Sequence, residues 1–134
     1  MNGINDLRGL WRGKLKYNVK PYKKGEWVEG HFTRLDDNNA AIIPHIYGYG
    51  EVEVEEDTLG ECTSSRDENG KPIFEGDICA VDDKIGVVRY DEEAAAFILD
   101  CDVQHLTFFY DINSSDVEVV GNIYDNPELL KGGN

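Results

Sequence analysis

The chain has 134 residues, of which 40% are hydrophobic and 30% are charged, a balance typical of one folded domain or of two small subdomains sharing a core. Its formal net charge of −14 opposes non-specific binding to DNA, RNA and anionic membranes, because their phosphates would repel it. No apolar run approaches the roughly 20 residues that cross a bilayer. The N-terminus also lacks the apolar core of a secretory signal, so we expect a cytoplasmic protein with no membrane partner.

The charge is unevenly distributed along the chain. Residues 1–24 contain seven basic side chains and one acidic side chain, a net charge of +6, so the remaining residues carry −20. One interpretation is that basic strand faces pair with acidic faces in the same fold or in a neighbouring subunit. A second is a small basic patch that recognises an acidic partner. A third is that the acidic remainder mimics nucleic acid in a site built for phosphates.

The first half of the chain predicts short strands separated by turns. Residues 7–16 mix apolar and basic side chains and predict an irregular first strand. Residues 26–33 and 40–46 are rich in aromatic, β-branched and other apolar side chains and predict two more strands. In residues 51–55 glutamate alternates with valine, which predicts a half-exposed strand with both valines on the buried face. The three aligned glutamates also suit a divalent cation, but we favour plain solvation.

The second half predicts a more regular series of strands. Asp67, Glu68, Asn69 and Gly70 predict a turn in which Asn and Gly adopt positive φ, and Pro72 predicts a strand start or a sheet edge. A second turn is expected at residues 75–77. Strands are then expected over 78–81, 85–90, 97–101, 106–110 and 117–124, the last with a bulge or bend at Gly121.

Five short strands at near-regular spacing predict a small antiparallel barrel of the SH3-like type. A short C-terminal helix follows at residues 126–130, where Asn126 would cap and Pro127 would occupy the first helical position. We therefore predict a mainly β protein, with an N-terminal β region at residues 1–65 and a C-terminal SH3-like β barrel at residues 66–134. The two regions either stand apart or form one continuous domain.

No known catalytic or cofactor motif is present. The sequence lacks the glycine-rich phosphate-binding patterns and the H-E-x-x-H zinc pattern. Cys62, Cys79 and Cys101 are far apart, which argues against a disulfide framework and predicts that Cys79 and Cys101 are small buried residues. We predict no catalytic residues, no metal and no cofactor, although the sequence leaves open whether the three histidines converge in space: His31, His45 and His105.

Glu75 and Asp77 place two carboxylates two positions apart in the sequence. Two nearby carboxylates could form an acid–base pair, since neighbouring groups can separate their pKa values. Their Glu-Gly-Asp context instead favours a turn whose carboxylates accept backbone N–H bonds.

Two groups of residues are candidate partner-binding sites. The first places an aromatic ring among basic side chains, a pattern that stacks on single-stranded nucleic acid, and comprises Arg8, Trp11, Arg12 and Lys14. The second lies in a Gly-rich segment and comprises Tyr47 and Tyr49, because tyrosine is enriched in protein interfaces. Trp27, Phe108 and Phe109 are expected to pack in the core.

Three motifs carry a family resemblance: RDENGKPIFEGDI, GVVRYDEEAAAFIL and VEVVGNIYDNPELL. Together with the earlier LWRGK and GEWVEG segments, they resemble the YopX family of phage and prophage proteins over most of the chain. One departure is Cys62, which stands where the family often has an aromatic residue.

The resemblance implies a small, mainly β protein of phage or prophage origin with no established activity. The motif residues carry over as turn-formers, namely Asn69, Gly70, Glu75, Gly76 and Asp77. We therefore expect a non-enzymatic accessory protein that binds a protein partner or a second copy of itself. The alternatives are a regulator that touches nucleic acid through the basic N-terminal segment, and a hydrolase or metal enzyme built from scattered His and carboxylate groups.

Overall fold

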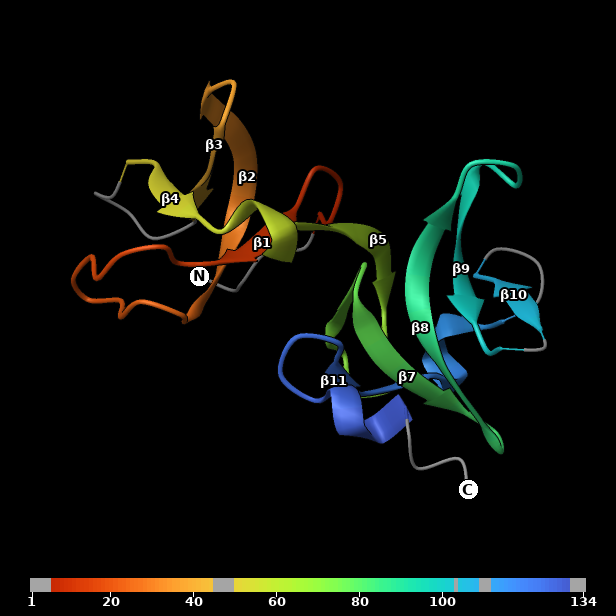
Figure 1. The fold of residues 1–134 in the computed structure, drawn as a ribbon. Helices are drawn as coiled ribbons and strands as arrows, with labels where there is room; N and C mark the ends of the chain where they lie inside the picture. Colours follow the sequence, from red (N-terminus) through yellow and green to blue (C-terminus); the bar gives the residue numbers. More distant parts are fainter. Residues whose placement is uncertain (1–5, 45–49, 103, 109–111, 131–134) are drawn as a thin grey trace. The chain divides into compact units, whose positions relative to one another are not determined.

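The computed structural model describes residues 6–44, 50–102, 104–108 and 112–130. The chain forms two compact units, Met1–Cys62 and Thr63–Asn134. Strands and turns make up nearly all of the described chain, and all the strand pairs are antiparallel (Figure 1). The prediction of a mainly β protein is therefore confirmed.

Four strands of the first unit follow from alternating and β-branched sequence. They are β1 (Trp11–Lys14), β2 (Trp27–Asp36), β3 (Asn39–Pro44) and β4 (Val52–Val54), followed by the 3-10 turn η1 (Glu56–Thr58) and the start of β5 (Gly60–Arg66). Their order in the sheet is β4-β3-β2-β1-β5. Strands β2 and β3 form a long antiparallel hairpin. Over the first half of β2, which has ten residues, buried and exposed side chains alternate, as expected for a strand with one face in the core.

The core of the first unit lies on one face of this sheet. Val28, Ile42, Val52 and Val54 project from three strands and pack with Leu15. Val52 and Val54 are 5% and 1% exposed, whereas Glu53 between them pairs with Lys16 at 3.3 Å. The alternation that the sequence predicts in residues 51–55 is therefore confirmed for Val52 and Val54. The Lys16–Glu53 pair is also one case in which an acidic residue of a strand neutralises a basic residue of the same unit.

The second unit contains a five-stranded sheet. Its strands are β7 (Asp77–Val81), β8 (Lys84–Asp91), β9 (Ala96–Asp100), β10 (His105–Thr107) and β11 (Glu118–Asn122), in the order β10-β9-β8-β7-β11. The short strand β6 (Pro72–Phe74) lies beside β5 at the edge of the other sheet, which confirms both expectations for Pro72. Five core residues, Ile73, Cys79, Val88, Leu99 and Val117, are fully buried.

The predicted barrel is wrong, because the second sheet is open. Strands β10 and β11 lie at opposite ends of the strand order, and no pairing joins them among the described residues. Closure would require the last strand to reach β10. Instead β11 pairs with β7, from Glu118 opposite Ala80 to Asn122 opposite Asp77, with a register shift next to Gly121 that confirms the expected bulge.

The predicted C-terminal helix is also corrected. Residues Pro127–Leu130 form only a 3-10 turn, η3. A segment of four residues is too short to offset the unfavourable free energy of nucleating an α-helix. The Asn126 side chain does not cap the turn but accepts the N–H of Asn122 through Oδ1 at 3.2 Å, which holds the end of β11.

The turn chemistry largely follows the sequence. Gly70 has a φ of +81°, as the predicted turn requires, whereas Asn69 is outside the left-handed region. Asp77 Oδ2 accepts the N–H of Phe74 at 2.8 Å, so the structural interpretation of its turn is confirmed for this carboxylate. Cys79 and Cys101 are buried free thiols as expected, and Cys62 is buried as well.

The sequence predicts no strand at the position of β5. Its sequence, GECTSSR, is mostly small and polar, so it lacks the apolar alternation that marks a strand. It is extended because its backbone groups pair with neighbours, including Trp11 opposite Glu61 and Arg12 opposite Gly60. Tertiary pairing here overrides weak local preference.

Candidate partner-binding surfaces

The register of β1 separates the predicted basic–aromatic group. Alternate residues of a strand point to opposite faces, so Trp11 projects to the face opposite to that of Arg12 and Lys14. Trp11 lies with the core residues and contacts Phe32, with ring centroids 4.9 Å apart and an interplanar angle of 34°. The four residues therefore do not form one surface around the Trp11 ring.

Trp27 lies on the same face of the sheet as Arg12 and Lys14. Trp27 lies directly opposite Lys14 in the β1–β2 pair. The Arg12 guanidinium is 4.6 Å from the centroid of the Trp27 ring, and Lys14 Nζ is 5.3 Å from it. Both distances are within the range of cation–π attraction. Trp27, which was expected in the core, is thus half-buried beneath two cations.

Four further residues singled out in the sequence are Arg8, Tyr47, Tyr49 and His45. Arg8 is exposed and donates to the carboxylate of Asp6 from Nε and Nη2, and this hydrogen bonding lowers the pKa of Asp6 to about 2. Tyr47, Tyr49 and His45 lie outside the described residues.

The segment that joins β1 to β2 is a hairpin held by backbone hydrogen bonds. In this basic hairpin, residues 15–26, Val19 and Tyr22 exchange two backbone hydrogen bonds, of 3.2 and 2.6 Å. The Asn18 side chain accepts the N–H of Lys24 at 2.8 Å. The side chains of Val19 and Tyr22 pack against the core of the first unit. The hairpin is therefore anchored at both its tip and its base.

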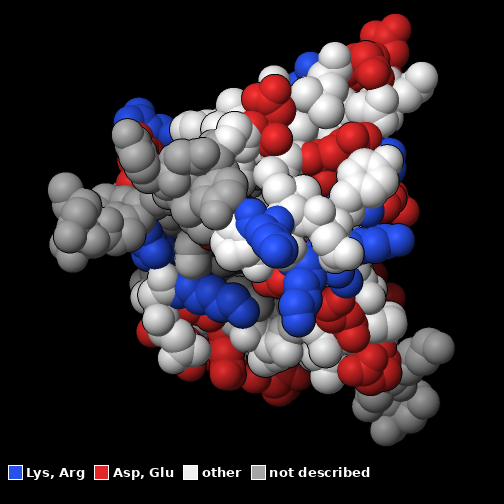
Figure 2. All heavy atoms as spheres, turned by 90° about the vertical axis from the view of Figure 1, so that its left-hand side faces the viewer, with Lys and Arg blue, Asp and Glu red and all other residues white. Residues whose placement is uncertain are grey.

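Three of the four lysines in the basic hairpin have no acidic side chain paired with them among the residues that the structure describes. Of its four lysines, Lys16 bonds to Glu53, which raises the pKa of Lys16. Lys20, Lys23 and Lys24 are exposed, and none forms an ion pair with any residue that the structure describes. Tyr17, next to Lys16, is 56% exposed. Figure 1 draws this hairpin on the left, and Figure 2 is viewed from that side, with several Lys and Arg side chains gathered near the middle of the view.

The second unit is strongly acidic. Residues 63–134 contain five basic and sixteen acidic side chains, a net charge of −11, so the first unit carries only −3. One ion cluster is built around Asp100, which lies 2.9 Å from Arg89 Nη2 and 3.2 Å from His105 Nε2. Burial alone would raise the pKa of Asp100, but the hydrogen bonds from Arg89 and from the backbone of Asp102 outweigh it, so the pKa is lowered.

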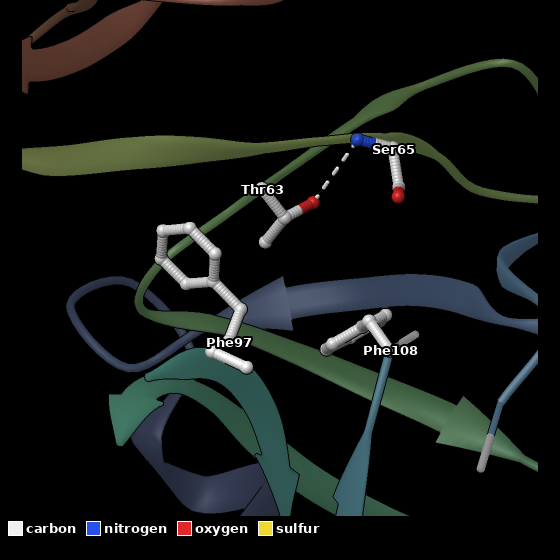
Figure 3. A pocket seen from close by; sticks show the side chains of 5 residues that line it. Thr63, Ser65, Phe97 and Phe108 are labelled. Carbon is white, nitrogen blue, oxygen red and sulfur yellow. Dashed lines mark hydrogen bonds between the residues drawn. The ribbon is translucent and has the colours of Figure 1, made fainter. Parts of the chain in front are cut away.

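The second unit also contains an open pocket of about 390 Å³. Its lining, here called the aromatic pocket, consists of Thr63, Ser65, Ala96, Phe97 and Phe108. Figure 3 shows the Phe97 ring beside Thr63 and Phe108 below the two hydroxyl-bearing residues, of which Thr63 accepts the N–H of Ser65 through Oγ1 at 3.2 Å. Both rings are half-buried and pack against the core of this unit. The pocket is within the size range of ligand sites and combines aromatic walls with a few hydroxyl groups.

The wall formed by Ala96 and Phe97 continues into an acidic turn. Ala96 lies opposite Asp91 in the β8–β9 pair, and the connection between them, here called the acidic turn, is Asp91–Ala95. Glu92 and Glu93 are exposed within it. Ala95, which precedes the wall, has a φ of +52°, a conformation that costs an L-residue about 1 kcal/mol or more.

No group of three or more His, Cys, Asp or Glu side chains that could hold a metal ion is present in residues 6–44, 50–102, 104–108 and 112–130. In that part of the chain, His105 lies beside the carboxylate of Asp100. No helix in the same residues is long and apolar enough to cross a membrane.

These features define a small antiparallel β protein of two units. A family model described as YopX protein matches residues 16–131. The chain therefore belongs to the YopX family, as the motifs indicated.

The crystal structure of protein EF1440 from Enterococcus faecalis aligns with 91% of this chain and 96% of its own, at 21% sequence identity and a TM-score of 0.47. No curated protein matches significantly.

Proposed function

We propose that this YopX-family chain is a phage or prophage accessory protein that acts in the cytoplasm of the bacterial host by binding a protein partner. The basic hairpin is the element that makes contact, and no catalytic step is involved. The observation that carries the proposal is the set of three unneutralised lysines, Lys20, Lys23 and Lys24, held on an anchored hairpin in a protein of net charge −14.

The order of the hairpin supports a binding role. Backbone bonds at Val19 and Tyr22 and the packing of both side chains fix the loop before any partner arrives. A preorganised loop loses less conformational entropy on binding than a flexible one. The lysine stems remain free to adjust to the partner.

The charge pattern supports an acidic partner site. A local group of lysines attracts carboxylates over about one Debye length, roughly 8 Å at physiological salt. At longer range the charge of −14 repels polyanions. A short acidic patch on a protein therefore fits this surface better than a long nucleic acid does.

Nucleic acid is the second candidate, and one observation favours it. Tyr17, 56% exposed beside the lysines, could stack on an unpaired base while the lysines contact phosphates. Such binding would weaken steeply with rising salt and would be abolished by nuclease treatment of the sample.

The test is affinity capture from phage-infected host cells with a matched pair of variants. Lys23→Gln with Lys24→Gln removes two charges from the hairpin, whereas Lys71→Gln with Lys84→Gln removes two from the second unit. We expect the hairpin variant to lose a nuclease-resistant protein that the wild type and the control variant both retain. Equal recovery by all three proteins would overturn the proposal, and loss of recovery after nuclease treatment would favour the second candidate.

A further inference from the structure

We propose that the partner of the basic hairpin is a second copy of this chain, and that the hairpin docks at the aromatic pocket of that copy. Tyr17 enters between Phe97 and Phe108, and the hairpin lysines face the acidic turn. The inference rests on the proposed function, because it uses the same hairpin as the binding element.

The pocket fits an aromatic side chain. Its volume of about 390 Å³ is bounded by two half-buried phenyl rings, so an inserted ring can pack edge-on or offset against both. Phe97 already makes one such contact, with Tyr90 at 5.3 Å and 78°. The hydroxyl groups of Thr63 and Ser65, which also line the pocket (Figure 3), offer hydrogen-bond partners for a phenol.

The charge beside the pocket favours a basic occupant. Asp91 lies opposite the pocket residue Ala96, and Glu92 and Glu93 are exposed on the turn that leads from it. The pocket belongs to a unit of net charge −11. A partner segment that carries a bulky ring among cations would satisfy both the apolar and the acidic part of this surface.

The chain itself contains such a segment. Residues 16–24 read KYNVKPYKK, with four lysines and no acidic residue. Tyr17 is exposed, whereas Tyr22 packs against the core of its own unit, so Tyr17 is the ring that is available for insertion. Charge complementarity between hairpin and turn therefore favours a second copy over a small apolar molecule.

A hairpin that enters a pocket joins two different surfaces, and each copy offers one of each. The contacts therefore either close reciprocally into a symmetric pair or continue from copy to copy into rings or open chains. Because the two surfaces differ, variants with a defect in only one of them can complement each other when they are mixed.

The test measures mass in solution by light scattering or sedimentation at low and high salt. The hairpin variant combines Tyr17→Ser, Lys23→Glu and Lys24→Glu. The pocket variant is Ala96→Trp, which fills the site, with Glu92→Lys plus Glu93→Lys as a second version that leaves the core untouched. Glu118→Lys with Glu128→Lys is the control, because it makes the same charge change at two exposed residues that do not line the pocket.

We expect the wild type and the control to associate at low salt, with mass that rises with concentration. The hairpin variant and either pocket variant alone should associate about tenfold more weakly or not at all, and higher salt should weaken the wild type. An equimolar mixture of the hairpin variant and Ala96→Trp should form a one-to-one pair that does not grow further, because only one intact contact remains.

Three results would overturn the inference: a wild type that is monomeric at every concentration at low salt, variants that associate as the wild type does, or a control that loses association equally. Failure here is distinguishable from failure of the proposed function. If the wild type is monomeric but the hairpin variant still loses its captured protein, the binding role stands with a different acidic partner. If capture is unchanged, the binding role falls independently of the oligomeric state.

Discussion

The carboxylate of Asp67 accepts the backbone N–H of Val119 through Oδ2 at 3.0 Å, which joins two residues 52 positions apart in sequence. Its Oδ1 accepts two more backbone donors, from Asn69 at 2.9 Å and Lys71 at 2.8 Å. A single buried side chain thus closes the turn between β5 and β6 and fastens β11 beside it. Asp67 is 5% exposed, so its three hydrogen bonds are shielded from competing water.

Replacement of this carboxylate should destabilise the second unit strongly. Asp67→Asn keeps one acceptor oxygen but turns an amide N–H₂ toward a backbone donor, and we expect a loss of about 2 kcal/mol in the free energy of unfolding. Asp67→Ala leaves three donors without their acceptor and should cost about 3 kcal/mol or more. Urea unfolding followed by fluorescence measures both. The exposed neighbour change Glu68→Gln serves as a control within about 0.5 kcal/mol of the wild type.

The same carboxylate predicts a pH dependence. Burial alone would raise the pKa of Asp67, but the backbone donors of Val119, Lys71 and Asn69 outweigh it, so its pKa in the folded protein is lowered. A lowered folded pKa means that the stabilisation is fully present above the unfolded value of about 3.9 and is lost as the pH falls through the folded value. The stability difference between wild type and Asp67→Asn should therefore be large near neutral pH and shrink in acid. Urea midpoints from about pH 6 to about pH 2.5 follow this trend, and a difference that stays constant would contradict it.

A close backbone approach in the first unit makes Gly30 irreplaceable. A Cβ atom added at Gly30 would lie 1.9 Å from the carbonyl oxygen of Ile43 in the neighbouring strand. The backbone cannot accommodate this without separating β2 from β3, so Gly30→Ala should destabilise the protein by about 3 kcal/mol or more. Gly50→Ala is the matched control, because an added Cβ meets no atom within 4 Å. Thermal unfolding of the two variants should differ clearly, and equal midpoints would refute the role given to Gly30.

Relief of backbone strain should stabilise the acidic turn. Ala95 adopts a φ of +52°, so Ala95→Gly removes a conformational penalty, although glycine gives part of it back as unfolded-state entropy. Because the relief of strain in the folded state exceeds the added entropy of the unfolded state, we expect the free energy of unfolding to rise by about 0.5 kcal/mol. Ala94, the preceding residue, is exposed and outside the left-handed region, so Ala94→Gly should instead cost about 0.5 kcal/mol. Opposite signs for these two adjacent substitutions are the result to look for in denaturant unfolding.

The three thiols should be almost inert in the folded protein. Cys62, Cys79 and Cys101 are 3%, 0% and 9% exposed. Burial, followed by the nearby Asp100 carboxylate, raises the pKa of Cys101, which lowers the fraction of reactive thiolate at neutral pH. Alkylation followed by mass spectrometry should show slow labelling of all three sites, fastest at the slightly exposed Cys101, and rapid labelling in denaturant. Fast labelling of Cys79 in the native protein would show that the second sheet opens readily.

Local patterns in the sequence determined the β class, the family and most strand positions. Alternation in residues 51–55 placed Val52 and Val54 in the core, and the Gly70 and Gly121 signals placed a turn and a bulge. These features depend on side-chain period and on backbone conformations of single residues, and both are legible within a few positions of the chain.

Only the tertiary structure decided which elements meet. It paired β11 with β7, so the sheet is open and not a barrel. It placed Trp11 with Phe32 and placed Trp27 beneath Arg12 and Lys14. It also shows that the polar segment β5 is a strand and that Thr63 and Ser65 line the aromatic pocket. Such choices depend on register and on pairing between residues far apart in sequence, where a shift of one position turns every side chain to the other face, and no local pattern encodes them.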